Sequence, residues 1–159
     1  MARRREQEPD RSVVRAGCAE VRADCACNGL RRAAREITQR YERALAPSGV
    51  KATQFPILVA LGEREQIPIV PLAEGLGLDR TTLTRNLRIL EGRGLVTVSA
   101  AEHDARMRLA SITDEGLRVL AHALELWRVE QHDVAEAFGP DRLRALFGDL
   151  SELTHTGQH

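Results

Sequence analysis

The sequence has 159 residues, a length that suits one domain or one domain with dimerisation arms, and its 23 basic and 23 acidic residues give a formal charge of zero. Net charge alone therefore indicates no polyanionic partner. Hydrophobic residues make up 43% of the chain, enough for an aliphatic core, but aromatic residues make up only 3%. So few rings argue against a stacking platform for single-stranded nucleic acid.

The N-terminal fifth contains all three cysteines, Cys18, Cys25 and Cys27. An odd number of cysteines confined to one short segment cannot form a stapling disulfide framework, which indicates a reducing compartment. The chain also lacks the apolar run of a signal peptide or a membrane span. We therefore expect a soluble, cytoplasmic protein that begins with a flexible arm over residues 1–23.

Three helices are predicted between residues 24 and 76. The first begins at Asp24 as its cap and ends before Pro47-Ser48-Gly49, because its apolar residues recur at spacings of three and four. The second begins with Thr53 as its cap and has Pro56 in its first turn. A loop over residues 63–68 then leads to a short helix over residues 69–76, with Pro71 in its first turn.

A helix over residues 80–91 and a β-hairpin follow. Asp79 is the predicted cap of this helix, which has leucines on one side and threonine and arginine on the other. The hairpin is predicted to pair a strand over residues 95–98 with one over residues 107–112, through a polar tip over residues 99–106.

Two more helices are predicted after the hairpin. Thr113 is the expected cap of the first, in which Gly116 replaces the glutamate of a capping box. A heptad-like apolar seam follows from Leu117 to Phe138 and favours a helical partner. Gly139-Pro140 breaks this helix, and the last amphipathic helix ends near Leu153.

The predicted fold class is mainly α with a small β-hairpin wing, a winged helix-turn-helix. Its charge is uneven: residues 80–113 contain six arginines against three acids, whereas residues 114–159 contain four bases against nine acids. Because the major groove of DNA admits one α-helix and a narrow minor groove attracts guanidinium groups, we expect the helix over residues 80–91 and the wing to bind duplex DNA. The candidate DNA contacts are Arg80, Thr81, Thr82, Thr84, Arg85, Arg88, His103, Asp104, Arg106 and Arg108.

Two stretches of sequence, LDRTTLTRNLRILEGRGLVTV and DARMRLASITDEG, resemble the MarR family of bacterial transcription regulators. The resemblance extends from about Asp24 to Leu153. It implies a homodimer with dimerisation helices over residues 24–52 and 114–155, a DNA-binding winged domain over residues 53–113, and a tail over residues 156–159. It also implies a transcriptional repressor that binds a palindromic operator in double-stranded DNA, with half-sites roughly 10 bp apart.

Such regulators commonly release DNA when a small molecule binds or a cysteine is oxidised. The elements that usually line the effector pocket carry Tyr41, Gln54, Phe55 and Trp127 here, and the aromatic residues among them also suit a plain apolar core. The family's peroxide sensors rely on neighbouring tyrosines, whereas this chain has only Tyr41.

The cysteines have three interpretations. If Asp24 caps the first helix, Cys25 and Cys27 lie in its first turn, where the helix dipole and nearby arginines stabilise thiolates that sense oxidants or electrophiles. Alternatively, Cys18, Cys25 and Cys27 capture a soft metal or arsenite, or they are inert small residues.

We predict no cofactor, no metal site and no enzymatic activity. The five histidines show no metal-ligand spacing, and no nucleophile elbow, P-loop or dinucleotide fingerprint occurs in the sequence. The expected partners are duplex DNA, a second copy of the chain and a small-molecule effector, with no membrane. The rival hypothesis is a winged-helix protein-interaction module that does not bind DNA.

Overall fold

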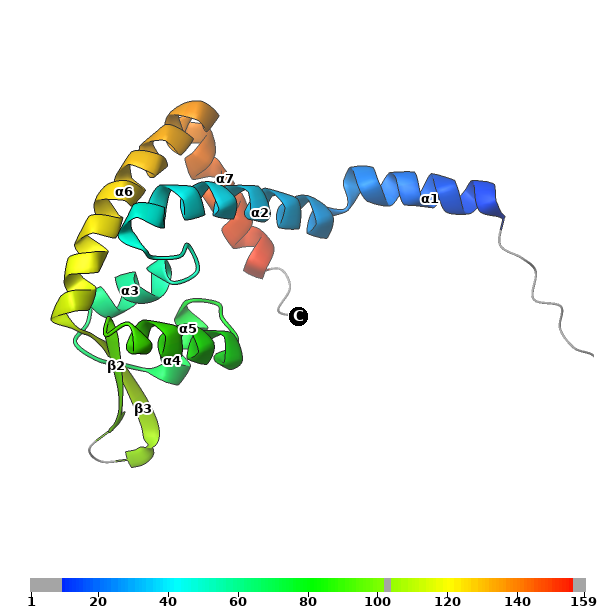
Figure 1. Ribbon diagram of the computed structural model, residues 1–159. Coiled ribbons are helices and arrows are strands. Elements are labelled where there is room, and N and C mark those ends of the chain that lie inside the picture. Colours follow the sequence, from blue (N-terminus) through cyan, green and yellow to red (C-terminus); the bar gives the residue numbers. More distant parts are fainter. Residues whose placement is uncertain (1–9, 102–103, 156–159) are drawn as a thin grey trace, which may run out of the picture. The chain divides into compact units, whose positions relative to one another are not determined.

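The computed structural model describes residues 10–101 and 104–155. The chain divides into two compact units, Met1–Arg40 and Tyr41–His159, which we describe separately. Figure 1 shows the mainly helical architecture with a small β-hairpin, as the sequence predicts. Within the described residues, no helix combines the length and the apolar character that crossing a bilayer would require.

The N-terminal unit is more helical than the sequence indicates. Helix α1 spans Arg11–Asp24, inside the segment predicted to be a flexible arm, and Asp10 caps it by accepting a hydrogen bond from the N–H of Ser12 (2.8 Å). Helix α2 spans Ala26–Leu45 and runs into the second unit. The predicted cap at Asp24 is wrong, because that residue ends α1 and the extended backbone of Cys25 separates the two helices.

The second unit continues with a short 3-10 helix, η1 (Ala46–Ser48), and helix α3 (Phe55–Gly62). Gly49 follows η1 with a φ of 71°, a conformation that favours glycine. The predicted cap at Thr53 is wrong, since Gln54 occupies the cap position and makes no side-chain capping bond. Pro56 lies in the first turn as predicted, where its missing N–H has no helical partner to lose.

The helix-turn-helix consists of α4 (Ile69–Gly75) and α5 (Arg80–Gly92). Gly77, with a φ of 61°, makes the tight turn between them. The predicted loop before α4 contains a two-residue strand, β1 (Ile67–Pro68). Sequence periodicity does not detect a strand of two residues, because alternation needs a longer run.

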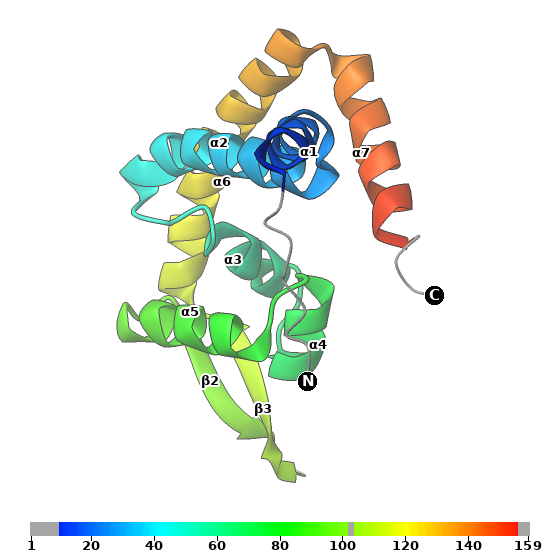
Figure 2. The same cartoon turned by 90° about the vertical axis from the view of Figure 1, so that its right-hand side faces the viewer.

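The wing is longer than predicted. Strand β2 spans Val96–Ala101 and strand β3 spans Asp104–Ile112, so pairing continues into the segment predicted to be a polar tip. The antiparallel sheet has the order β1-β3-β2, with a register irregularity between Ala100 and Ala101. Figure 2 shows the hairpin extending beyond α4 and α5, away from the other helices of this unit.

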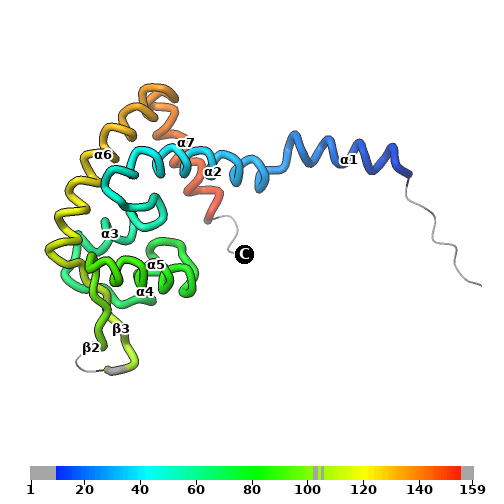
Figure 3. Tube along the Cα trace, viewed as in Figure 1, coloured from blue at the N-terminus to red at the C-terminus, as the bar shows by residue number. Residues whose placement is uncertain are grey.

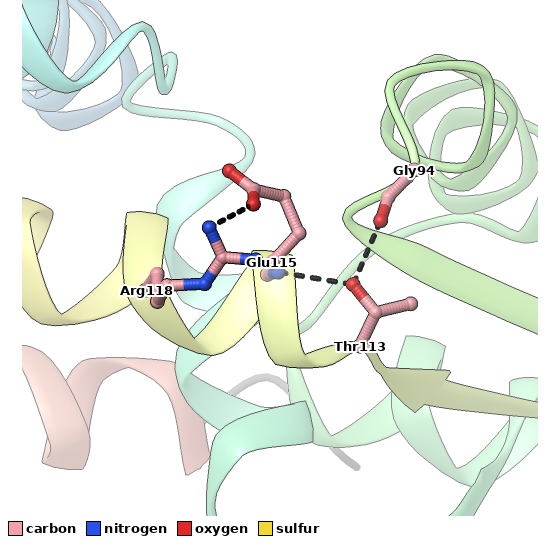
Figure 4. A network of polar contacts seen from close by, with 5 residues as sticks. Gly94, Thr113, Glu115 and Arg118 are labelled. Carbon is pink, nitrogen blue, oxygen red and sulfur yellow. Dashed lines mark hydrogen bonds and ion pairs between the residues drawn. The ribbon is translucent and has the colours of Figure 1, made fainter.

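A polar network anchors the start of helix α6 (Asp114–Phe138), as Figure 4 shows. The Thr113 hydroxyl donates to the carbonyl of Gly94 (2.7 Å) and accepts from the N–H of Gly116 (3.0 Å), which confirms the predicted cap. A Cβ at position 116 would lie 2.1 Å from the carbonyl oxygen of Leu95. Close packing against Leu95, just before β2, therefore explains why glycine stands where a capping box would have glutamate.

Helices α3 and α6 pack closely around the core of the second unit. A Cβ at Gly62 would lie 2.7 Å from Cδ2 of Leu120, so the two helices approach where α3 has no side chain. Helix α7 (Pro140–His155) returns after Gly139, whose φ is 97°, and Figure 3 traces this reversal. The largest fully buried apolar side chains come from the residues that flank η1 and from α3, α5 and β2: Leu45, Val50, Ile57, Leu58, Leu61, Leu83, Leu87, Leu90 and Val96.

Candidate nucleic-acid interface

The N-terminus of α5 is fixed by its cap. The N–H of Thr82 donates to Oδ1 of Asp79 (2.8 Å), and the Thr82 hydroxyl donates to Oδ2 of the same carboxylate (2.6 Å). These bonds hold the pKa of Asp79 below its usual range, and the bond from the Thr82 hydroxyl has the larger effect. The sequence predicts Thr82 as a DNA contact, whereas in the structure its hydroxyl serves the cap.

The two sides of α5 have opposite characters. Leu83, Leu87 and Leu90 are buried on one side. Asn86 is buried beside them, and its side-chain amide donates to the carbonyl of Thr82 (3.0 Å). Because α5 has about 3.6 residues per turn, its polar residues gather on the opposite side. There the structure brings together the predicted contacts around one shallow surface hollow: Arg80, Thr81, Thr84, Arg85 and Arg88.

The predicted wing contacts are ordered by local hydrogen bonds. The N–H of Arg106 donates to Oδ1 of Asp104 (2.9 Å), so Asp104 orders the backbone of Arg106. The guanidinium of Arg108 donates to the carbonyl of Val98 (3.1 Å). His103 lies outside the described residues.

A cleft of about 740 Å³ separates the wing from α4 and α5. Arg80 and Arg88 of α5 line one wall, and Arg106 and Arg108 of β3 line the other. Glu91 and Asp104 also line it, so four cations face two carboxylates. The two grooves of a duplex are separated by a sugar-phosphate backbone, and a basic cleft between a helix and a hairpin suits that backbone.

The candidate effector residues fall into two groups. The rings of Phe55 and Trp127 stack with their centroids 6.4 Å apart, and both line a largely apolar hollow between α3 and α6. Gln54 is buried and accepts a hydrogen bond from the N–H of Lys51 (3.3 Å), and the Tyr41 hydroxyl donates to Oε1 of Gln131 (2.5 Å). Neither Tyr41 nor Gln54 lines that hollow.

The three cysteines are free thiols in the N-terminal unit. Cys18 lies within α1 and Cys27 is the second residue of α2, and both are exposed, whereas Cys25 is half-buried. Cys27 thus stays in a first helical turn, although the helix begins one residue later than predicted. Among residues 10–101 and 104–155, no group of three metal-ligating side chains lies together, so the soft-metal interpretation gains no support from the geometry.

Sequence reasoning missed two residues that shape this region. The carboxylate of Glu91 accepts a hydrogen bond from the N–H of Val98 (3.1 Å), and Arg93 donates to the carbonyl of Gly49 (2.8 Å). Both bonds join a side chain at the end of α5 to a distant backbone group. Such pairs have no periodic signature in a sequence, and only the tertiary structure brings them together.

Comparison with known proteins places this geometry among DNA-binding regulators. The model of the MarR family matches residues 50–107, which include α3, the helix-turn-helix and most of the wing. The chain is similar to the organic hydroperoxide resistance transcriptional regulator of Bacillus subtilis, with 32% identity over 100 residues, or 63% of this chain and 68% of that protein.

Two solved structures with DNA are also similar to this chain. The Mycobacterium tuberculosis transcriptional regulator MosR in complex with DNA is 38% identical, with a TM-score of 0.75, and the match covers 86% of this chain and all of that chain. The repressor CouR of Rhodococcus jostii, bound to a 23-mer duplex, is 28% identical with a TM-score of 0.75, covering 81% of this chain and 92% of that chain.

Proposed function

Because the chain belongs to the MarR family of winged-helix transcriptional regulators, we propose that it is a homodimeric repressor that binds a palindromic operator and is released by a small molecule or by cysteine oxidation. In this proposal α5 enters the major groove, and the wing tip enters the adjacent minor groove. Such a protein acts on chromosomal DNA, which accords with the expected cytoplasmic location.

The observation that carries the proposal is the clustering of cations around the cleft between α5 and the wing. Arg80, Arg88, Arg106 and Arg108 come from two elements that are distant in sequence, and they line one cleft. Arg85 lies on the outward side of α5, where a guanidinium can bind guanine O6 and N7. A protein-interaction module does not need arginines from a helix and a hairpin to line one cleft that suits a DNA backbone. We therefore prefer the DNA-binding proposal.

A two-fold dimer is proposed from the apolar side chains that α6 and α7 leave exposed. Val129, Phe138, Phe147 and Leu153 are all at least 38% exposed within the described structure. Large apolar side chains left exposed on neighbouring helices favour an interaction site. Two copies related by a two-fold axis would present two α5 helices to half-sites roughly 10 bp apart.

Two routes of release are proposed, each with residues to support it. The hollow beside Phe55 and Trp127 offers apolar and aromatic walls to a small effector. The exposed thiols of Cys18 and Cys27 are accessible to oxidants, and the similar Bacillus subtilis protein is named for organic hydroperoxide resistance.

The proposal is tested by titrating the protein into labelled DNA from upstream of its own gene. We expect one palindrome to be preferred by about 10³-fold over random DNA, and Arg85→Ala to lose a large part of that preference. Arg144→Ala, which removes only an exposed ion pair to Asp141, is a matched arginine control that leaves DNA binding unchanged. Absence of any DNA binding at low salt would overturn the proposal.

Thiol-dependent release is tested on the same complex. Oxidation should release DNA from the wild type and leave it bound to a variant in which Cys18, Cys25 and Cys27 are all replaced by serine. Release of DNA from that variant by the same oxidant would show that the thiols are not the sensor.

A further inference from the structure

The backbone N–H and the backbone carbonyl of Val98 are both hydrogen-bonded to side chains from other elements. The N–H of Val98 donates to Oε1 of Glu91, and its carbonyl accepts from Nη2 of Arg108, each at 3.1 Å. Val98 lies in β2, which is at the edge of the sheet in the order β1-β3-β2. Because successive residues of an edge strand turn their polar groups alternately to the neighbouring strand and to the outside, these are outward-facing groups.

The two side chains reach Val98 from the two elements proposed to contact DNA. Glu91 is in the last turn of α5. Arg108 is in β3, two residues before Ala110, which pairs with Val98. One residue of β2 thus ties the end of the recognition helix to the arginine-bearing strand of the wing.

Each of the two side chains is also close in sequence to a proposed DNA contact. Glu91 follows Arg88 by three residues, so the two lie on one side of α5, and Arg108 follows Arg106 by two residues in β3. All four line the cleft between α5 and the wing. A shift at Val98 would therefore change the separation between Arg88 and Arg106.

We propose that Glu91 and Arg108 are positioning residues whose bonds to Val98 set the separation between the recognition helix and the wing. This inference rests on the proposed function and assigns each residue a role within it. Arg108, predicted from the sequence as a DNA contact, acts here through the backbone of β2. Glu91 carries the charge that phosphate repels, so its contribution to DNA binding comes from its hydrogen bond.

Glu91 offers a matched pair of substitutions. Glu91→Gln removes the charge but keeps an oxygen acceptor for the N–H of Val98, whereas Glu91→Ala removes both. Removal of an acid beside DNA by itself strengthens binding to phosphate, and both variants share that effect. The difference between them therefore isolates the hydrogen bond to Val98.

Methylation protection by dimethyl sulfate reads the two grooves separately, because the reagent attacks guanine N7 in the major groove and adenine N3 in the minor groove. The probe is a duplex selected from random sequence by the wild type. At equal occupancy, we expect Glu91→Ala to protect guanine N7 like the wild type and to lose about fivefold or more of its protection at adenine N3, while Glu91→Gln protects both. An unchanged ratio of the two protections in Glu91→Ala, or an equal loss in Glu91→Gln, would overturn the proposal.

Hydrogen exchange of the Val98 amide tests the contact without DNA. We expect exchange to become about tenfold faster in Glu91→Ala and to stay within about twofold of the wild type in Glu91→Gln. Unchanged exchange in Glu91→Ala would overturn the positioning role, even if the protein binds DNA. Failure of the wild type to bind any duplex would instead overturn the proposed function, and the two failures are thus distinguishable.

Discussion

The winged region and the α6–α7 end of the same unit differ in how far their apolar side chains are buried. In the winged region, Leu83 and Leu90 are fully buried between α5 and its neighbours. In α7, Phe147 and Leu153 remain 57% and 50% exposed. A single chain therefore completes the core of the winged region, whereas α7 keeps an exposed apolar surface. We propose that a second copy of the chain covers this surface.

Helix α6 belongs to both regions. Along its apolar seam, Leu120 and Val134 are buried, whereas Leu117 and Phe138 are 45% and 38% exposed. The apolar seam predicted from Leu117 to Phe138 is therefore divided between an internal and an external role. This division lets one helix connect the winged region to the proposed dimer surface.

The largest effect is expected from a cavity in the core. Leu61, which is fully buried in α3, should cost about 2–5 kcal/mol of unfolding free energy when replaced by alanine. The matched change Leu153→Ala, in exposed surface of α7, should cost less than about 0.5 kcal/mol in the monomer. Urea unfolding of both variants measures the difference, and equal losses would contradict the contrast between the regions.

The two regions also differ at glycine. Gly116→Ala should lower the unfolding free energy by about 1–3 kcal/mol or more, because its Cβ would meet the Leu95 carbonyl at 2.1 Å. A Cβ added at Gly148 in α7 would have nothing within 4 Å. Gly148→Ala should therefore raise the unfolding free energy by about 0.5–1 kcal/mol. Thermal unfolding at one protein concentration measures both changes, and stabilisation by Gly116→Ala would show that the close approach to Leu95 is wrong.

The exposed surface of α7 should affect assembly more than folding. We expect Phe147→Asp to weaken self-association by about tenfold or more, because it places a charge in an apolar interface. Sedimentation equilibrium measures the association constant, with Arg144→Ala as a nearby control that removes only the exposed ion pair to Asp141. A dimer of unchanged stability in Phe147→Asp would place the interface elsewhere.

The smallest effect is expected at the cap of α5. Because its bonds to Thr82 hold the pKa of Asp79 below the unfolded value, the carboxylate stabilises the fold above the unfolded pKa and loses that contribution as the pH falls through the folded pKa. The wild type should therefore lose more stability than Asp79→Asn between about pH 5 and pH 2. Denaturant midpoints across this range measure the effect, and parallel pH profiles would argue against the cap.

Local chemistry in the sequence predicted much of the winged region. The caps at Asp79 and Thr113 and the buried leucines of α5 depend on neighbouring residues, and the structure contains all of them. What the sequence did not predict depends on distant contacts or on short elements. Strand β1 exists only because Ile67 and Pro68 pair with β3, and the break at Cys25 divides what apolar spacing indicated as one helix.

The candidate site shows the same distinction. Helical periodicity placed the arginines and threonines of α5 together, because it needs only a spacing of about 3.6 residues. The roles of Glu91 and Arg108 depend on the backbone of Val98, which lies seven and ten residues away in sequence, and no local pattern reports such bonds.

The central claim, that the winged region binds duplex DNA through its arginines, is tested most directly by the salt dependence of DNA affinity. Fluorescence anisotropy should show that the logarithm of the association constant falls linearly with the logarithm of salt concentration, by about 10³-fold or more between 50 and 200 mM if roughly six or more phosphates are contacted. Arg88→Ala should make this slope shallower by about one unit, because one fewer cation would meet the backbone. Affinity independent of salt, or an unchanged slope in Arg88→Ala, would contradict the account.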